Sequence, residues 1–95
     1  MIEAACATGL PAYISNDIDG TDAADADATG TPEPDGLRVE TVRTLITRLA
    51  SEVGLIAGDV VEVAPLLGRN AGERTLAVAA EYVRVTLQGL LRGLE

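Results

Sequence analysis

The chain has 95 residues, enough for one small domain or for part of a larger one. Its formal net charge of −8 argues against binding to nucleic acid or to anionic membrane surfaces, because both select for Lys and Arg. Hydrophobic residues make up 47% of the chain, which is too rich a composition for a disordered tail. We therefore expect a folded acidic protein.

Several residue types are scarce or missing. A single cysteine, Cys6, excludes an intrachain disulfide, and no apolar run approaches the roughly 18 residues of a membrane span. These features favour a cytoplasmic setting. The chain has no histidine, which removes the commonest general base and the commonest transition-metal ligand. It also lacks Phe and Trp, so its core must be mainly aliphatic.

The first half of the chain predicts a strand, a long loop and a helix. Residues 12–18, AYISNDI, favour a short strand that runs into an acidic segment. Residues 20–36 are rich in Gly, Thr, Asp, Ala and Pro, and a loop of this length is usually functional or disordered. From Arg38 to Val53, apolar residues recur at steps of three and four, which predicts an amphipathic helix that ends at Gly54.

The second half repeats this order. Residues 59–63 predict a second strand that ends before Pro65, and residues 66–72, LLGRNAG, predict a second loop. A final helix continues to the C-terminus. Its apolar stripe comprises Leu76, Ala80, Val83, Leu87, Leu90 and Leu94.

The alternation of strand and helix predicts an α/β fold with parallel strands, as in a doubly wound sheet. Two parallel strands are not stable alone, and parallel sheets are normally covered on both faces. The β-α-β-α segment is therefore incomplete by itself. Self-association or a partner chain could supply the missing layers.

Five aspartates lie from Asp17 to Asp27, beginning at the end of the first predicted strand. In doubly wound folds, ligands bind at the carboxyl ends of the strands, where Asp17, Asp19 and Glu62 are expected. Two acids two residues apart on a strand share a face, and three converging carboxylates require a cation such as Mg²⁺, Ca²⁺ or Mn²⁺. The alternative is a solvated loop, in which Asp serves turn formation. An EF-hand calcium loop fits poorly, because Ala26 stands where the bidentate Glu belongs.

The stretch from Ser15 to Leu37, SNDIDGTDAADADATGTPEPDGL, resembles the signature of the ureohydrolases, the family of arginases, agmatinases and formiminoglutamases. That signature reads roughly S-x-D-x-D-x-x-D-P, a short spacer, then G-T-G-T-P-x-x-G-G-L. Residues 59–65, DVVEVAP, resemble the family's D-x-x-E-x-x-P block, and Thr75 falls where the family usually carries Thr-Ala. The resemblance covers about residues 12–92.

The resemblance implies a site residue by residue. Asp17 would bridge two Mn²⁺ ions, Asp19 would bind one of them, and Glu62 would contact the guanidinium group of a small substrate. Thr31 would lie in the loop that lines the active-site mouth. The chemistry implied is hydrolysis of a guanidino-type C–N bond, with release of urea. The loop itself would be ordered by Asp22, Gly30 and Pro32.

The sequence departs from the family pattern in two ways. Ala23, Asp25, Asp27 and Asp35 replace two prolines, an aromatic residue and a glycine, which should loosen the loop and add charge to it. The family's other metal ligands lie upstream, in histidine-containing segments that this chain lacks. Residues 1–95 thus resemble a C-terminal fragment of a single ureohydrolase-like domain, and the resemblance implies that the chain would carry half of a dinuclear site and would be inactive alone.

The resemblance leaves substrate and partner open. Arginine, agmatine and formiminoglutamate all remain possible substrates, although GTPEP leans towards agmatinases. The expected partner is an N-terminal portion of the same fold or another copy of the chain. Two other classes remain as alternatives: a non-catalytic interaction module, which would pair through its exposed sheet edge and helix faces, and a calcium-binding acidic protein.

Among the remaining residues, Tyr82 is predicted to pack in the core rather than act in catalysis. Arg69, Arg74 and Arg84 are expected to be solvated. Asp25 and Asp27 are expected to be solvated too, with an auxiliary metal role as the alternative.

Overall fold

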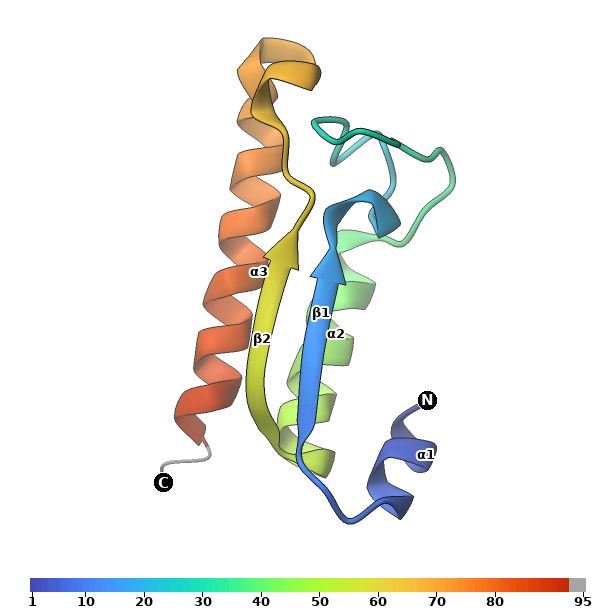
Figure 1. Ribbon diagram of the computed structural model, residues 1–95, viewed down its shortest axis with the longest axis vertical. Coiled ribbons are helices and arrows are strands. Elements are labelled where there is room, and N and C mark those ends of the chain that lie inside the picture. Colours follow the sequence, from blue (N-terminus) through green and yellow to red (C-terminus); the bar gives the residue numbers. More distant parts are fainter. Residues whose placement is uncertain (93–95) are drawn as a thin grey trace.

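A computed structural model describes residues 1–92 and shows an α/β fold built on a small parallel sheet (Figure 1). The predicted fold class is therefore confirmed. In chain order, the elements are α1 (Ile2–Ala7), β1 (Ala12–Asp17), η1 (Ile18–Gly20), α2 (Val39–Arg48), η2 (Leu49–Val53), β2 (Leu55–Val61), η3 (Pro65–Leu67), η4 (Arg69–Gly72) and α3 (Glu73–Arg92). No helix within residues 1–92 combines the length and the apolar character that crossing a bilayer requires.

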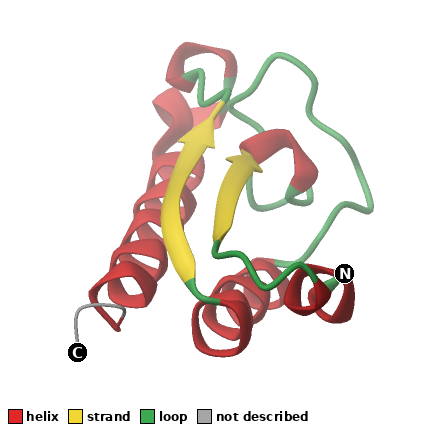
Figure 2. Ribbon diagram, turned by 60° about the horizontal axis from the view of Figure 1, so that its bottom comes forward, coloured by secondary structure: helices red, strands yellow, loops and turns green. Residues whose placement is uncertain are grey.

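The two strands lie parallel, with Ser15 opposite Asp59 and Asp17 opposite Val61. Both strands end at the same edge of the sheet, where the long loop after β1 begins (Figure 2). Along β1, half-buried and exposed residues alternate. Ile14 packs against the core, while Tyr13 on the opposite face is exposed. One face of the sheet is therefore covered by helices, and the other is open.

The core lies between the sheet and the helices α2 and α3, and a segment of the long loop contributes to it. Its largest fully buried side chain is Tyr82, whose hydroxyl lies 2.6 Å from the hydroxyl of Thr21 in a buried hydrogen bond. The prediction that Tyr82 packs in the core agrees with this position. The buried cluster consists of Ile18, Ala26, Val42, Ile46, Leu55, Val78, Tyr82 and Val85.

The predicted bounds of β2 were wrong. The strand begins at Leu55, four residues before the predicted start, and it ends at Val61 rather than Val63. Gly58 made this segment look unlike a strand, because Gly is disfavoured in strand interiors. The structure explains the glycine, since a Cβ there would lie 2.8 Å from the Thr86 side chain and 2.9 Å from that of Ile14. The close approach of α3 thus leaves no room for a larger residue.

The long helix predicted from Arg38 to Val53 is present, but its last turn is wider than an α-helical turn. α2 ends at Arg48 and continues as the π-helical turn η2. Gly54 stops it with a φ of 97°, a conformation that favours glycine. The predicted end of the helix is confirmed.

Most of the apolar stripe identified on the final helix faces away from the core, although Leu90 packs against it. Leu76, Val83 and Leu87 remain 45%, 45% and 53% exposed. Leu94 lies outside the described residues. The face of α3 that is buried carries Thr75, Val78, Tyr82, Val85, Thr86 and Gly89.

The buried face of α3 is the one that packs closely against its neighbours, not the one with the most hydrophobic residues. Gly89 illustrates this: a Cβ at that position would lie 2.8 Å from the Cβ of Ala50. Small and partly polar residues let α3 approach η2 and the sheet closely, at the expense of apolar area. The more hydrophobic face is left towards solvent.

Val83 and Val85 offer a matched test of which face of α3 is buried, since Val85 is 5% exposed. Val85→Ala should lower the free energy of unfolding by about 2 kcal/mol, because it removes two buried methyl groups. Val83→Ala should change it by less than about 0.5 kcal/mol. Urea denaturation followed by circular dichroism measures both. Equal losses for the two variants would contradict the observed orientation of α3.

Candidate active site

The last residues of the two strands form the C-terminal end of the sheet. Because several acids gather there, we call this end the acidic edge. Asp17 is the final residue of β1 and pairs in register with Val61, the final residue of β2. Glu62 follows directly. Because the strands are parallel, Asp17 and Glu62 lie at the same edge, which is where ligands bind in doubly wound folds.

Asp19 lies beyond the strand, in the short 3₁₀ turn η1. The Asp17 carboxylate caps this turn, since its Oδ1 accepts a hydrogen bond from the Asp19 backbone N–H at 3.1 Å. Ile18, between the two acids, is fully buried and anchors the turn to the core. The prediction that Asp17 and Asp19 project from one face of a strand was therefore wrong, because the chain turns at Ile18.

Thr31 lies beside Asp19 although the two are distant in sequence. Its hydroxyl donates a hydrogen bond to Asp19 Oδ2 at 2.5 Å. The loop thus folds back on itself and brings its Gly-Thr-Pro segment, residues 30–32, to the acidic edge. Nothing within 4 Å would obstruct a side chain at Gly30.

Asp22 organises the beginning of the loop. Its Oδ1 accepts a hydrogen bond from the Ala24 backbone N–H at 2.9 Å, and its own N–H donates to the Leu37 carbonyl at 2.9 Å. Gly36 lies against this turn, where a Cβ would come within 2.8 Å of the Asp22 nitrogen. The two ends of the loop are therefore held together by backbone contacts that only glycine permits.

The middle of the loop is buried between α3 and the segment that follows β2. Ala26 and Ala28 are fully buried. The Ala28 backbone N–H donates to the Thr75 hydroxyl at 3.1 Å, and the Ala28 carbonyl accepts from the Ala64 N–H at 2.7 Å. This loop is thus an integral part of the fold, tied at once to the helix and to the Glu62 segment.

Two ion pairs fasten the same loop to the chain after β2. Asp27 Oδ2 accepts hydrogen bonds from the Arg69 backbone N–H at 3.2 Å and from Arg69 Nε at 2.9 Å. The Asp25 carboxylate accepts from Arg74 Nε at 3.0 Å. These contacts correct the expectation that Asp25, Asp27, Arg69 and Arg74 are simply solvated. Arg84 is also paired, with Glu81 at 2.8 Å.

The hydrogen bonds of Asp27 alter its titration. The Arg69 backbone N–H and guanidinium hold the pKa of the Asp27 carboxyl below its ordinary value. The cause is stabilisation of the ionised form by two donors, one of which is charged.

Asp59 lies at the centre of a further polar cluster on the open face of the sheet. The sequence alone did not predict this cluster. The Asp59 carboxylate accepts hydrogen bonds from the Tyr13 hydroxyl and, at 2.8 Å, from the Ser15 hydroxyl on the neighbouring strand. The Tyr13 and Ser15 donors lower the pKa of Asp59, and Asp59 in turn raises the pKa of Tyr13. Alternation within β1 places both donors on one face, but only the strand register reveals their common acceptor.

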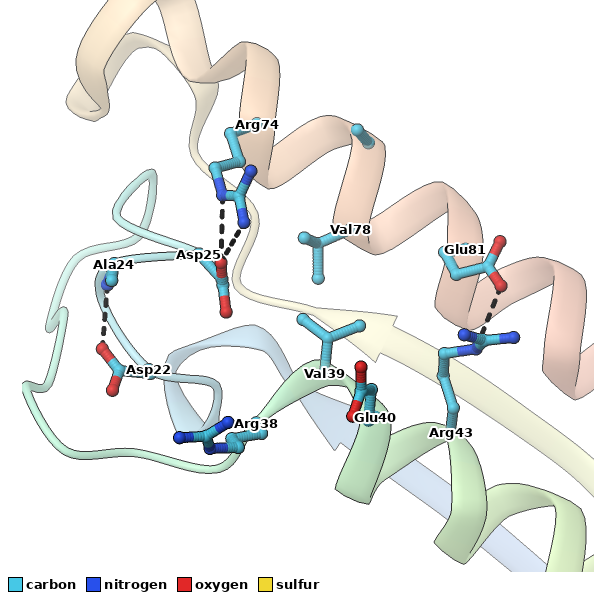
Figure 3. A pocket seen from close by; sticks show the side chains of 11 residues that line it. Asp22, Ala24, Asp25, Arg38, Val39, Glu40, Arg43, Arg74, Val78 and Glu81 are labelled. Atoms are coloured by element: carbon cyan, nitrogen blue, oxygen red, sulfur yellow. Dashed lines mark hydrogen bonds and ion pairs between the residues drawn. The ribbon is translucent and has the colours of Figure 1, made fainter.

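A cavity of about 570 Å³ lies away from the acidic edge. It is a groove between the loop, the start of α2 and α3, with Val39 and Val78 among its apolar residues (Figure 3). Its charged walls are largely paired with one another, Asp25 with Arg74 and Arg43 with Glu81. Neither Asp17 nor Glu62 lines it. We therefore regard the edge of the sheet, not this groove, as the candidate active site.

The three predicted acids do not form a compact cluster. Within residues 1–92, no three His, Cys, Asp or Glu residues gather closely enough to hold a metal ion. Asp17 and Asp19 are joined through the Asp19 N–H, whereas Glu62 follows the end of the neighbouring strand. The prediction that three carboxylates converge in this chain was therefore wrong.

Comparison with known proteins assigns the family. The sequence pattern that describes the "Arginase family" matches residues 1–88. The chain belongs to the arginase family.

Two curated members show how much of a whole protein this arginase-family chain spans. It is 34% identical over 85 residues to the agmatinase of Bacillus cereus, a match that covers 88% of this chain and 29% of the relative. The arginase of Schizosaccharomyces pombe is 37% identical over 78 residues, covering 81% of this chain and 24% of the relative. The chain thus spans less than a third of each relative.

The fold of the arginase-family chain also matches solved structures. The agmatine ureohydrolase of Thermoplasma volcanium superposes with a TM-score of 0.66 and 41% sequence identity, over 82% of this chain and 25% of that one. The resemblance in sequence is therefore accompanied by a resemblance in fold.

Two residues of the arginase-family motifs have a left-handed backbone. Glu62 has a φ of 69° directly after β2, and Asp35 has a φ of 58° where the family signature carries glycine. Such conformations cost non-glycine residues about 1–3 kcal/mol and concentrate at functional sites. The strain at Glu62 is consistent with a residue whose position matters more than its local stability.

The Asp27–Arg69 pair predicts a pH dependence. Because the folded-state pKa of Asp27 is depressed, its contribution to stability is complete above the ordinary carboxyl pKa of about 3.9 and is lost as the pH falls through the folded value. Asp27→Asn should therefore be less stable than the wild type at pH 7, and the difference should close under acid conditions. Unfolding measured between pH 7 and pH 3 tests this.

The matched control for that experiment is Asp35→Asn. It removes the same charge from the same loop, at an exposed position whose left-handed backbone asparagine tolerates. A stability difference for Asp27→Asn that stays constant from neutral to acid pH would contradict the role of the ion pair.

Proposed function

We propose that this chain is the part of a manganese-dependent ureohydrolase that supplies Asp17 and Asp19 to the metal site and Glu62 to the substrate. The observation that supports the proposal is the common position of these acids. Asp17 ends β1, and Glu62 follows the end of β2 at the same edge of a parallel sheet. Membership of the arginase family is the reason to propose that this edge takes part in hydrolysis of guanidino-type C–N bonds.

The donor set suits a hard divalent cation. Asp17 uses Oδ1 and Asp19 uses Oδ2 for the hydrogen bonds found within residues 1–92, which leaves one oxygen of each carboxylate for another ligand. Carboxylate oxygens of this kind favour Mn²⁺ or Mg²⁺ over soft metals. When bound, such ions lower the pKa of water and so supply a nucleophile near neutral pH. The two aspartates would supply part of the ligand set of the two metal ions.

The remaining residues would position the substrate and the ligands. Glu62 is exposed and can bind a planar guanidinium through charge-assisted hydrogen bonds. Thr31 would fix the orientation of Asp19 through its hydrogen bond to Oδ2. Asp22, Gly30 and Pro32 would maintain the loop that brings Thr31 to the edge.

Activity would require further ligands from elsewhere. Two aspartates cannot complete a dinuclear site, and the curated relatives extend well beyond the segment that this chain matches. We infer that residues 1–95 alone release no urea and that an N-terminal ureohydrolase portion is the partner that completes the site. The substrate would be a small guanidino compound, with agmatine the first to test because agmatinases are among the relatives.

A single-chain chimera tests this function. In the agmatinase of Bacillus cereus, the segment matched over 85 residues would be replaced by the corresponding part of this chain. The chimera should release urea from agmatine when supplied with Mn²⁺. Glu62→Gln should lower kcat/KM roughly 10- to 100-fold, because it removes a charged hydrogen-bond acceptor. Asp17→Asn should reduce activity to background.

The control variant for activity is Asp35→Asn, which removes one negative charge from the loop without touching the proposed ligands. It should retain the chimera's rate. Urea release that is unaffected by Asp17→Asn, or a folded chimera with no activity at all, would contradict the proposed function.

A further inference from the structure

The chain contains two Asp-Gly dipeptides, Asp19-Gly20 and Asp35-Gly36, one at each end of the long loop. An aspartate that precedes glycine cyclises more readily than other aspartates, because glycine has no Cβ to hinder attack of its backbone nitrogen on the aspartate side chain. The two dipeptides share this intrinsic reactivity. Their surroundings in the fold differ, so the structure decides which of them reacts.

The Asp19-Gly20 dipeptide is held in place. Both residues belong to the 3₁₀ turn η1, and the Asp19 N–H donates to Asp17 Oδ1 at 3.1 Å. Asp19 Oδ2 accepts a hydrogen bond from the Thr31 hydroxyl at 2.5 Å. Cyclisation requires the carboxyl carbon of Asp19 to swing onto the Gly20 nitrogen. The hydrogen bond to Thr31 and the turn would both have to break first.

The Asp35-Gly36 dipeptide is far less restrained. Asp35 is exposed and ends an exposed run, residues 30–35. Among residues 1–92, no ion pair of the Asp35 carboxylate and no backbone hydrogen bond from the Gly36 N–H is found. Both reacting groups are therefore available in the folded chain. Asp35 stands where the family signature carries glycine, so this dipeptide is a feature of this chain.

We propose that Asp35 is a site of spontaneous isoaspartate formation in the folded protein. The Gly36 nitrogen attacks the side-chain carboxyl carbon of Asp35, and the carboxyl hydroxyl leaves with the N–H proton as water. The new C–N bond closes a succinimide ring. Water then adds to one of the two ring carbonyls: opening at the main-chain carbonyl gives isoaspartate, and opening at the other restores aspartate. The reaction consumes no oxidant or reductant.

This modification would act on the contacts that close the loop. The Leu37 N–H donates to the Gly20 carbonyl at 2.8 Å, and the Leu37 carbonyl accepts from the Asp22 N–H at 2.9 Å. Gly36 packs so tightly against Asp22 that a Cβ would lie 2.8 Å from the Asp22 nitrogen. An isoaspartyl link inserts one methylene group into the backbone directly before these contacts. The modified loop would no longer match them in length.

The experiment compares the two dipeptides in the same molecule. The purified chain is kept for several weeks at neutral pH and physiological temperature, in buffer and in concentrated urea. Isoaspartyl methyltransferase quantifies the product, and electron-transfer fragmentation assigns it to a residue. In buffer, Asp35 should convert roughly tenfold or more faster than Asp19, because a hydrogen bond to the Asp19 carboxylate must break first. In urea, the two rates should be similar.

Asp35→Gly is the matched variant, because glycine suits the left-handed φ of 58° at this position. It should abolish isoaspartate formation at residue 35. Wild-type chain that is largely converted should melt roughly 4–8 °C below fresh chain, the effect of losing about one backbone hydrogen bond in a domain of this size. Asp35→Gly stored in the same way should keep its Tm. Asp35→Asn should react faster and release ammonia, so the comparisons above require it freshly purified.

The readouts need neither metal nor substrate, so they are independent of the proposed function. Similar rates at Asp19 and Asp35 in buffer, with circular dichroism showing a folded chain, would overturn the proposal, because the sequence alone would then govern the reaction. A folded chain without isoaspartate at residue 35 would overturn it as well. Conversion of Asp35 with an unchanged Tm would overturn the inferred effect on the loop.

Discussion

The structure depends on the backbone of Ala28. Its N–H binds the Thr75 hydroxyl of α3 and its carbonyl binds the Ala64 N–H after β2, so one buried residue of the loop joins three parts of the fold. A buried backbone group without a partner costs about 1–3 kcal/mol, so these two bonds leave the loop little freedom to lie elsewhere. The loop is anchored at its middle, and its two ends are held by the contacts around Asp22 and Gly36.

Anchoring of the loop determines the arrangement of the candidate site. Asp17 and Asp19 precede the anchored segment and Thr31 follows it, while Glu62 lies two residues before Ala64 on the neighbouring part of the chain. The geometry of the acidic edge therefore rests on contacts made at a distance from the acids themselves. In this arrangement, the stability of the core and the position of the proposed ligands depend on the same hydrogen bonds.

Charge is distributed unevenly along the chain, and the structure partly compensates for it. The loop from Asp17 to Asp35 contains acids and no Lys or Arg, and the cations that pair with two of these acids come from η4 and α3. Arg69 and Arg74 pair with Asp27 and Asp25, which occupy positions where the family signature has a proline and an aromatic residue. Exposed pairs of this kind contribute modestly to stability, but here they act on a loop that the buried contacts already hold. Asp17 and Asp19 take part in none of the ion pairs found within residues 1–92, and a cation bound at the acidic edge would offset their charge.

Much of the fold could be predicted from the sequence because local patterns and tertiary structure agree there. A strand over residues 12–18 was predicted and ends one residue earlier, the helix that stops at Gly54 followed from periodicity and glycine placement, and the parallel pairing followed from the alternation of strands and helices. The acidic edge followed from the predicted position of Asp17 and Glu62 near the ends of their strands. Two sequence motifs, residues 15–37 and residues 59–65, indicated the ureohydrolases, and the family match confirmed that assignment.

The predictions that failed concern features set by packing between distant segments. The sequence indicated the apolar stripe of α3 and the core position of Tyr82 but not the rest of the buried face, where Thr and Gly allow close packing against the sheet and η2. Gly58 hid the first half of β2 for the same reason. The ion pairs of Asp25 and Asp27 join residues more than forty positions apart, which no local pattern reveals. Asp19 left the strand face because the chain turns at the buried Ile18.

The central claim is that Asp17 and Asp19 form part of a divalent metal site. Calorimetric titration of the purified chain with Mn²⁺ tests it most directly, with Asp17→Asn and Asp35→Asn measured alongside. We expect saturable binding that Asp17→Asn abolishes and Asp35→Asn preserves, although both variants lose one negative charge. Binding that weakens equally in the two variants would reflect the acidity of the loop alone. That result, or the absence of binding to a well-folded chain, would contradict the claim.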